Sequence, residues 1–196
     1  AVKPQQFPEV ARESKPFLKK NQILISILAG TTLSSLQKHL GSAPALVRVM
    51  PNLGALVVEA MSAICSKNET ASKKTELILK ACGEVVCVSE PLLNLVTAVS
   101  GSGPAYFFLL MERLEKEAIR GGLDPDSARK LAIRTSLGAA RLATETFHSP
   151  DVLRSMVTSK GGTTEAALSV FEEYGFDEMV AEAVAKATQR AKELSN

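Results

Sequence analysis

Two glycines and two threonines stand together in the stretch SKGGTTEAAL, directly before a segment with helical periodicity. Gly161 and Gly162 can take positive φ angles, and Thr163 and Thr164 can cap the helix that follows. Free amide groups at a helix start point outward with the positive end of the helix dipole. The pattern predicts a site for a phosphate or a carboxylate, with an ordinary glycine joint as the alternative. Glu165 also balances the dipole, and we expect its carboxylate to face solvent.

A second glycine-rich stretch, SGSGPAY, lies inside an otherwise helical region. Gly101 and Gly103 should interrupt the helical hydrogen bonds, and Pro104 should restart them as the first residue of a new helix. Such a restart exposes amide donors and lets a ligand approach the backbone closely. A kink that lets two helices cross is the alternative interpretation.

Composition excludes several classes of partner. The 23 basic and 21 acidic residues are spread along the chain and give a formal charge of +2, which argues against nucleic acid. Apolar runs such as residues 22–30 are far shorter than the roughly 18 residues of a membrane span, and no signal segment opens the chain. We therefore expect a cytoplasmic protein that binds no membrane.

The sulfur and imidazole side chains indicate no catalytic or metal site. Cys65, Cys82 and Cys87 lack metal-ligand spacing and have apolar neighbours, so we expect reduced, buried thiols. His39 and His148 lie far apart in sequence with no motif around either. A Cys-His or Ser-His nucleophilic pair is therefore not expected.

The first half of the chain, residues 1–89, alternates short apolar runs with helical patterns. Helical patterns precede residue 20, begin at a hydroxyl cap near residue 31 and fill residues 71–81. The end of a strand is predicted at residues 1–4, a strand with a turn at 45–52, and further strands at 23–28, 60–66 and 84–88. This order predicts an α/β domain with a largely parallel, doubly wound sheet. Ligands in such sheets lie over the carboxyl ends of strands, although no G-x-G-x-x-G dinucleotide motif is present.

The second half, residues 90–196, is predicted to be all-helical. Helical patterns cover residues 91–99, 104–120, 125–147, 163–174 and 176–194. The helix from Pro125 is rich in alanine and apolar nearly all round, which is typical of a helix that is buried. A chain of this size must often borrow a second subunit to bury such a helix, so we expect an obligate dimer.

Five stretches together resemble one family. They are AVKP (1–4), AG.T (Ala29, Gly30, Thr32), MPN (50–52), VSGSGPAY (99–106) and TSKGGTTEAAL (158–168). In order and spacing they resemble those of pyrroline-5-carboxylate reductase, over essentially the whole chain. The resemblance implies reduction of the cyclic imine pyrroline-5-carboxylate to L-proline by NADPH or NADH. It also implies a Rossmann domain followed by a helical dimerisation domain, with dimers that assemble into pentamers of dimers.

The resemblance also assigns site residues. The positions that match the family's cofactor site are Val2, Lys3, Pro4, Ala29 and Asn52. The positions that match its substrate site are Glu90, Ser159, Gly161, Gly162, Thr163 and Thr164. Of these, Glu90 matches an acidic residue near the substrate, and the Thr164 hydroxyl is expected near the ring nitrogen as the catalytic side chain.

The family's glycine-rich first βαβ unit would precede Ala1, so the resemblance implies a chain that lacks the front of its Rossmann domain. An inactive fragment or an oligomerisation module is therefore an alternative function. A second alternative is a dehydrogenase of the β-hydroxyacid type, which would use a lysine in the interdomain helix. Lys116 is the candidate there, although no motif surrounds it.

Overall fold

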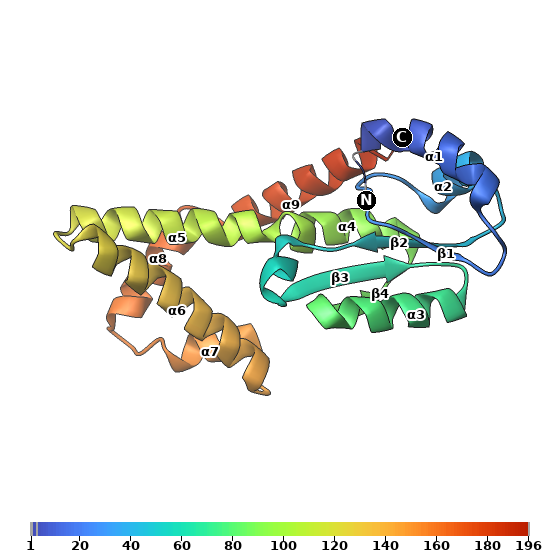
Figure 1. The fold of residues 1–196 in the computed structure, drawn as a ribbon. Coiled ribbons are helices and arrows are strands. Elements are labelled where there is room, and N and C mark those ends of the chain that lie inside the picture. The colour runs from blue at the N-terminus through green and yellow to red at the C-terminus, as the bar shows by residue number, and fades with distance from the viewer. Residues whose placement is uncertain (1, 3, 196) are drawn as a thin grey trace. The chain divides into compact units, whose positions relative to one another are not determined.

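A computed structural model of the protein describes residues 2 and 4–195 (Figure 1). The chain divides into two compact units, which are treated separately below. The sheet unit comprises Ala1–Pro104 and Ala183–Asn196, and the helical unit comprises Ala105–Glu182.

The sheet unit is built on four strands in the order β1-β2-β3-β4. They are β1 (Ile23–Ser26), β2 (Ala45–Met50), β3 (Ala60–Cys65) and β4 (Gly83–Cys87). β1 pairs with β2 and β3 pairs with β4 in parallel, whereas β2 and β3 are antiparallel. The prediction of a largely parallel sheet is confirmed, with this one exception. The β2–β3 connection spans only residues 51–59, which is too short for the crossover that a parallel pair requires.

Helices cover both faces of the sheet, as predicted. Figure 1 shows α1 (Phe7–Ser14) and α2 (Leu33–Leu40) on one face and α3 (Glu69–Leu79) on the other. Strand residues alternate between two cores. Ala63 and Cys65 pack with α1 and α2, whereas the residues Val47, Val49 and Ile64 pack with α3. This alternation follows from the two-residue period of a strand.

The helix starts in the sheet unit follow their local sequence. Thr32 caps α2, because its Oγ1 accepts a hydrogen bond from the amide of Ser35 at 3.1 Å. Gly41 ends α2 with a φ of 82°, which favours glycine. The first residues form a short 3-10 helix, Pro4–Gln6, in place of the predicted end of a strand. Ala1 and Lys3 of that prediction lie outside the described residues.

Several 3-10 turns link these elements. They are Lys15–Phe17, Leu53–Val57, Lys80–Cys82 and Glu90–Leu92. Val58, directly after the second of them, has a φ of 63° and a ψ of 25°. Among the described residues it is the only non-glycine residue with a positive φ, and a β-branched side chain is strained there.

The predicted helix over residues 91–99 is interrupted. After Glu90–Leu92 come a single turn of α4 (Leu93–Val96) and a π-helical turn, Thr97–Gly101. The amide of Ser102 donates to the Thr97 carbonyl at 2.8 Å, and α5 (Gly103–Arg120) then begins. The predicted interruption is thus confirmed, with the restart one residue before Pro104. Segments of this kind are frequent at functional sites.

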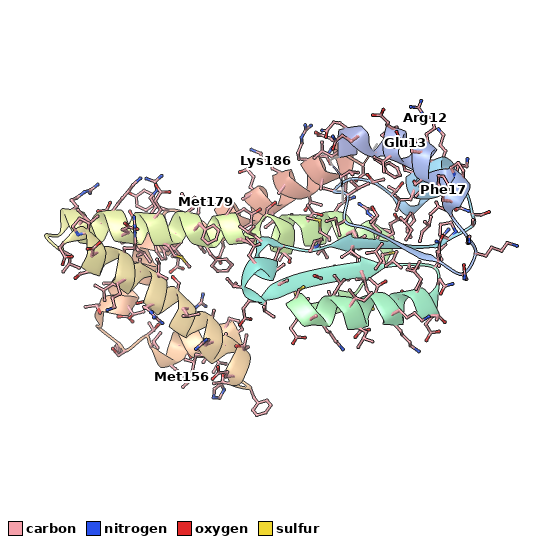
Figure 2. All side chains as sticks on the ribbon, viewed as in Figure 1. Arg12, Glu13, Phe17, Met156, Met179 and Lys186 are labelled. Atoms are coloured by element: carbon pink, nitrogen blue, oxygen red, sulfur yellow. The ribbon has the colours of Figure 1, made fainter. Side chains whose placement is uncertain are left out.

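The helical unit contains most of α5, then α6 (Pro125–Glu145), α7 (Pro150–Met156), α8 (Thr163–Glu173) and the first turns of α9 (Phe176–Glu193). Helix α7 was not predicted from the sequence. It has seven residues and opens with a proline at its first position, a recognisable start signal. Its last residue, Met156, is 65% exposed (Figure 2).

The expected burial of the helical unit does not occur within one chain. Among residues 105–182, only Ala128 and Ala132 are buried. The segment Glu90–Arg120 is also long and apolar enough, by length and composition alone, to cross a membrane. The expectation that apolar runs fall far short of such a length is wrong here, because helices on both sides of the glycines join into one segment.

The three thiols are free, as expected, but they differ in burial. Cys65 is buried, Cys82 is half-buried and Cys87 is exposed. The expectation of three buried thiols is therefore wrong for Cys87 and is met only in part by Cys82. That residue lies on β4, an edge strand, whose outer face has less cover than the central strands.

Candidate functional site

The loop before α8 requires its two glycines for different reasons. Gly161 has a φ of 71°, in the left-handed region that favours glycine. Gly162 is extended, with a φ of −86°, so the prediction of a positive φ is wrong at this position. A Cβ on Gly162 would lie 2.5 Å from the Ser159 hydroxyl oxygen and 2.9 Å from its carbonyl oxygen. Steric contact with Ser159, rather than backbone angle, therefore demands glycine at Gly162.

The head of α8 presents amide groups that the protein leaves without acceptors. The amide of Gly162 donates to the Ser159 carbonyl at 3.0 Å, and that of Ala166 donates to the Gly162 carbonyl at 3.2 Å. Throughout residues 2 and 4–195, no hydrogen bond uses the amides of Thr163, Thr164 or Glu165. Three amides at the positive end of the α8 dipole are thus available to an anion.

Glu165 does not simply face solvent. Its side chain is exposed, but its Oε2 accepts a hydrogen bond from the amide of Gly161 at 2.7 Å. The negative carboxylate interacts favourably with the positive end of the α8 dipole, and it does so by turning back over the loop that precedes the helix. It thereby takes one donor of the predicted anion site and leaves the three amides of the first helical turn.

The two threonines do not cap α8, contrary to prediction. The N-cap is Gly162, with no side-chain hydrogen bond, and Thr163 is already the first helical residue. Thr163 is exposed and Thr164 is half-buried. Within the described part of the chain, the Thr164 hydroxyl makes no hydrogen bond, so it is available to a ligand. The identity of a capping residue depends on where the helix begins. The repeated glycines and threonines leave that starting position uncertain by one or two residues when only the sequence is used.

In the sheet unit, the carboxyl ends of β1 and β2 lie at one edge, because the two strands are parallel and Ser26 pairs with Arg48. Ala29 is exposed just beyond β1. Gly30 has a φ of 75°, and a Cβ there would lie 2.4 Å from the carbonyl oxygen of Leu194. The end of the chain therefore packs directly on this loop.

Asn52 directs its side chain into the protein. Its Nδ2 donates to the Ser100 carbonyl at 3.2 Å, and its Oδ1 accepts from the amides of Gly54 and Met61, each at 3.2 Å. The amide group thus connects the end of β2 to β3 and to the π-helical turn. We find Asn52 positioned to shape this edge rather than to offer its side chain to a ligand.

Glu90 is similarly engaged. Its Oε1 accepts from the backbone amide of Leu33 at 2.6 Å and from Arg48 Nη1 at 3.2 Å. The Arg48 side chain is only 6% exposed, and that of Glu90 is 29% exposed. Arg48 was missed by the sequence analysis, although a charged residue within the apolar run ALVRVM is the signal that could have revealed it.

The thiol of Cys65 lies within the electrostatic reach of this pair. Burial, and secondarily the negative charge of Glu90, raise the pKa of Cys65 above the ordinary value of a cysteine, while the positive charge of Arg48 opposes the shift. Cys65 is therefore a neutral core side chain, not an activated thiolate.

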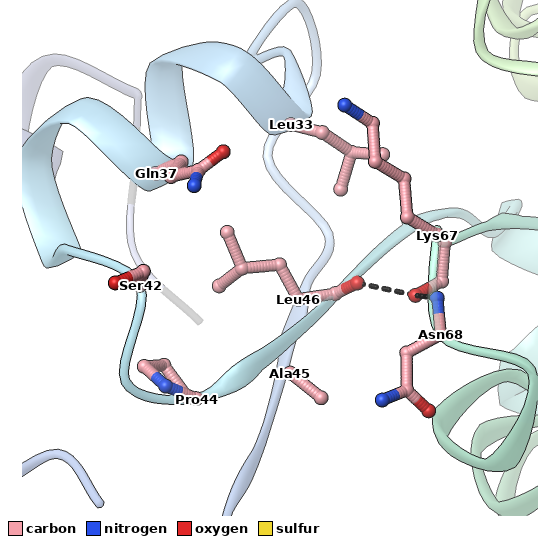
Figure 3. Close-up of a pocket in the computed structure, with 9 residues that line it drawn as sticks. Leu33, Gln37, Ser42, Pro44, Ala45, Leu46, Lys67 and Asn68 are labelled. Carbon is pink, nitrogen blue, oxygen red and sulfur yellow. Dashed lines mark hydrogen bonds between the residues drawn. The ribbon is translucent and has the colours of Figure 1, made fainter. Parts of the chain in front are cut away.

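Two other features carry no predicted site residue. A surface pocket of about 210 Å³ lies between α2, the start of β2 and residues 66–68, which follow β3 (Figure 3). Ser66 Oγ donates to the Leu46 carbonyl at 2.6 Å there. Lys116, the lysine of the alternative dehydrogenase hypothesis, lies on α5 and pairs with Glu112 one turn earlier. Neither arrangement gathers groups for hydride transfer.

The predicted site residues fall into two groups. Val2, Pro4, Ala29, Asn52 and Glu90 belong to the sheet unit, and Ser159, Gly161, Gly162, Thr163 and Thr164 to the helical unit. Lys3 lies outside the described residues. Val2 contributes to a cavity of about 150 Å³ beside β1 and α1.

Comparisons with known proteins agree with this geometry. Residues 90–194 match the family model "Pyrroline-5-carboxylate reductase dimerisation". The chain is 39% identical to pyrroline-5-carboxylate reductase of Pseudomonas aeruginosa, with 100% of this chain and 73% of that protein covered. The enzyme of Methanosarcina acetivorans is 42% identical, with 99% of this chain and 73% of that protein covered.

Solved structures give the same result. The pyrroline-5-carboxylate reductase of Coxiella burnetii matches 100% of this chain and 74% of its own with a TM-score of 0.94 and 40% identity. The Plasmodium falciparum pyrroline carboxylate reductase with NADP bound has a TM-score of 0.91 and 31% identity, and the match covers 100% of this chain and 80% of that one. By sequence and by fold, the chain belongs to the pyrroline-5-carboxylate reductase family.

Proposed function

We propose that this reductase converts pyrroline-5-carboxylate to L-proline, and that the head of α8 holds the substrate carboxylate. The observation that carries the proposal is the set of three amides, of Thr163, Thr164 and Glu165, that lack acceptors within the described protein. A carboxylate bound there gains charge-assisted hydrogen bonds and the favourable end of the helix dipole. Ser159, Gly161 and Gly162 give the loop the shape that leaves those amides open.

Thr164 is the side chain that we assign to the ring nitrogen. Thr164 is half-buried and is adjacent to the proposed carboxylate site, so one residue can contact both ends of a five-membered ring. The imine nitrogen is basic enough to carry a proton in part, and a hydroxyl that does not titrate near neutral pH can orient it. Thr164 therefore orients the ring rather than supplying an acid.

The cofactor, NADPH or NADH, supplies the hydride when bound. The residues present fit its nicotinamide end, because Ala29 is exposed at the carboxyl edge of the sheet and the next residue is a glycine in the left-handed region. We assign Val2 and Ala29 to direct contacts there, and the family resemblance alone adds Lys3 and Pro4 to this proposal. Asn52, whose side chain is fully hydrogen-bonded, would shape the site or contact the cofactor through its backbone.

We further propose a domain boundary at residues 89 and 90, with a Rossmann domain before it and the dimerisation and substrate-binding domain after it. The match of residues 90–194 to a dimerisation family supports this boundary. We assign the apolar segment Glu90–Arg120 to a subunit interface rather than to a membrane, because α5 has Phe107 64% and Phe108 55% exposed in the single chain. A pentamer of dimers in the cytoplasm is the assembly that we propose.

Thr164→Ala in the complete reductase tests the substrate site. Loss of the hydroxyl should lower kcat about tenfold, since a hydrogen bond of about 1.4 kcal/mol is removed from the reacting ring, while the affinity for NADPH is retained. Steady-state kinetics with pyrroline-5-carboxylate measure the first effect and fluorescence titration the second. Unchanged kcat and KM would contradict the assignment.

Gly162→Val probes the same site through its shape. The added side chain would clash with Ser159 and displace the loop, so we expect binding of pyrroline-5-carboxylate to be lost. Gly138→Ala is the matched control in the helical unit, because a Cβ there meets no atom within 4 Å. Equal effects of the two substitutions would show that general damage, rather than the loop, is responsible.

A further inference from the structure

Glu90 joins two segments that are far apart in the sequence. It begins the 3-10 helix Glu90–Leu92, and its Oε1 accepts the amide of Leu33 at 2.6 Å. Leu33 is the first residue of α2, so its amide has no partner inside the helix. Both Glu90 and Thr32 therefore cap α2: the Glu90 carboxylate accepts the amide of Leu33, and the Thr32 hydroxyl accepts the amide of Ser35.

Arg48 holds this carboxylate in place. Its side chain is 6% exposed, in the middle of the sheet, and Glu90 is the ion-pair partner found for it among residues 2 and 4–195. A buried cation is costly without an anion, so the pair constrains Glu90 to the position from which it reaches Leu33. The same oxygen takes both donors, which fixes the geometry of all three groups.

The loop between β1 and α2 is held on both sides as a result. On one side, Glu90 anchors the head of α2 directly after residues 27–32. On the other, the Leu194 backbone packs so closely on Gly30 that no Cβ would fit between them. Ser195 Oγ in turn lies 3.3 Å from Asn94 Oδ1, which ties the end of the chain to the segment that Glu90 begins.

We infer that Glu90 is a positioning residue for the cofactor: held by Arg48, its carboxylate fixes the Leu33 amide and, through it, the loop that carries Ala29. This role differs from direct contact with the substrate, which the family resemblance suggests for Glu90. It rests on the proposed placement of Ala29 at the nicotinamide end. An anchored loop loses less conformational entropy when the cofactor binds, so the anchor should contribute to cofactor affinity.

The test compares Glu90→Ala and Glu90→Gln in the complete reductase. Glu90→Ala removes the acceptor, and we expect hydrogen exchange at the Leu33 amide to become at least about tenfold faster in the ligand-free protein, with a rise in the NADPH Kd of about tenfold. Glu90→Gln keeps a carbonyl acceptor but loses the charge, so it should fall between the wild type and Glu90→Ala. Glu69→Gln, on the exposed first turn of α3, is the control that should change neither quantity.

Two results would overturn the inference. In the first, Leu33 exchange and NADPH Kd stay unchanged in both Glu90 variants. In the second, only the KM for pyrroline-5-carboxylate rises, which would show direct substrate contact. If Glu90→Ala does not fold, Glu90→Gln alone decides between these outcomes.

Ala29→Val separates this inference from the proposal on which it rests. A bulkier side chain at the exposed Ala29 should weaken NADPH binding whatever Glu90 does. If Ala29→Val leaves the NADPH Kd unchanged, the placement of the cofactor is wrong and the inference falls with it. If Ala29→Val weakens binding and the Glu90 variants do not, only the anchoring role is wrong.

Discussion

The sheet unit and the helical unit differ in how they bury their apolar residues. The sheet unit has two cores, one on each face of the sheet, with Leu36, Val47 and Ile64 all at 0% exposure. The helical unit buries only Ala128 and Ala132, while Phe107 is 64% exposed. Both units have regular, well-formed helices, so secondary structure is not what separates them.

The difference indicates where each unit obtains its stability. Apolar burial contributes about 25 cal/mol per Å², and a unit that leaves its large side chains in water lacks most of that contribution. The helical unit must therefore obtain its core from another chain, as the matched dimerisation family implies. The sheet unit can obtain most of its stability from apolar residues that are buried within one chain.

Phe107→Glu should have the largest effect. A charge in the middle of the proposed interface should convert the dimer to monomer and make helix content in the helical unit depend on protein concentration. Light scattering after size exclusion and circular dichroism measure the two effects. Phe17→Glu is the matched control, because Phe17 is 75% exposed in the sheet unit and should leave the dimer intact (Figure 2). Equal behaviour of the two variants would contradict the comparison.

Val58→Gly should have a smaller effect, confined to the sheet unit. Glycine relieves about 1–2 kcal/mol of strain at the positive φ of Val58, and about 0.5–1 kcal/mol of backbone entropy offsets part of it. We expect a net gain of about 1 kcal/mol in the free energy of unfolding, measured with urea and independent of protein concentration. Val57→Gly should instead destabilise the protein, because φ is not positive at Val57. A gain in the free energy of unfolding at both positions would contradict backbone strain at Val58.

Cys65→Ala should have the smallest effect on how stability depends on conditions, since it changes only the pH dependence of unfolding at alkaline pH. Because the folded state raises the pKa of Cys65, its contribution to stability is fully present below the ordinary pKa of a cysteine and is lost as the pH rises through the folded pKa. Urea unfolding between about pH 8 and about pH 10 should therefore be less pH-dependent in Cys65→Ala. A pH dependence in Cys65→Ala as steep as that of the wild type would contradict this contribution.

The sequence by itself determined the family and most of the elements, although helix α7 was missed. Strand β2 (Ala45–Met50) lies within the stretch 45–52 that is predicted as a strand with a turn, because an apolar run between turns has few alternatives. The glycine stretches located the π-helical turn and the head of α8, since glycine marks backbone that other residues cannot adopt. Such patterns predict secondary structure because they act between residues that are close together in the sequence.

Only the tertiary structure decided how the polar groups are used. The pairing of Glu90 with Leu33 and Arg48 crosses 57 and 42 positions of sequence, and the return of Glu165 to Gly161 depends on the exact start of α8. A hydrogen bond requires two atoms within about 3 Å, and that coincidence is set by how strands and helices pack rather than by either residue's type. Candidate site residues could therefore be proposed from the sequence, but the hydrogen-bond partners of their side chains could not.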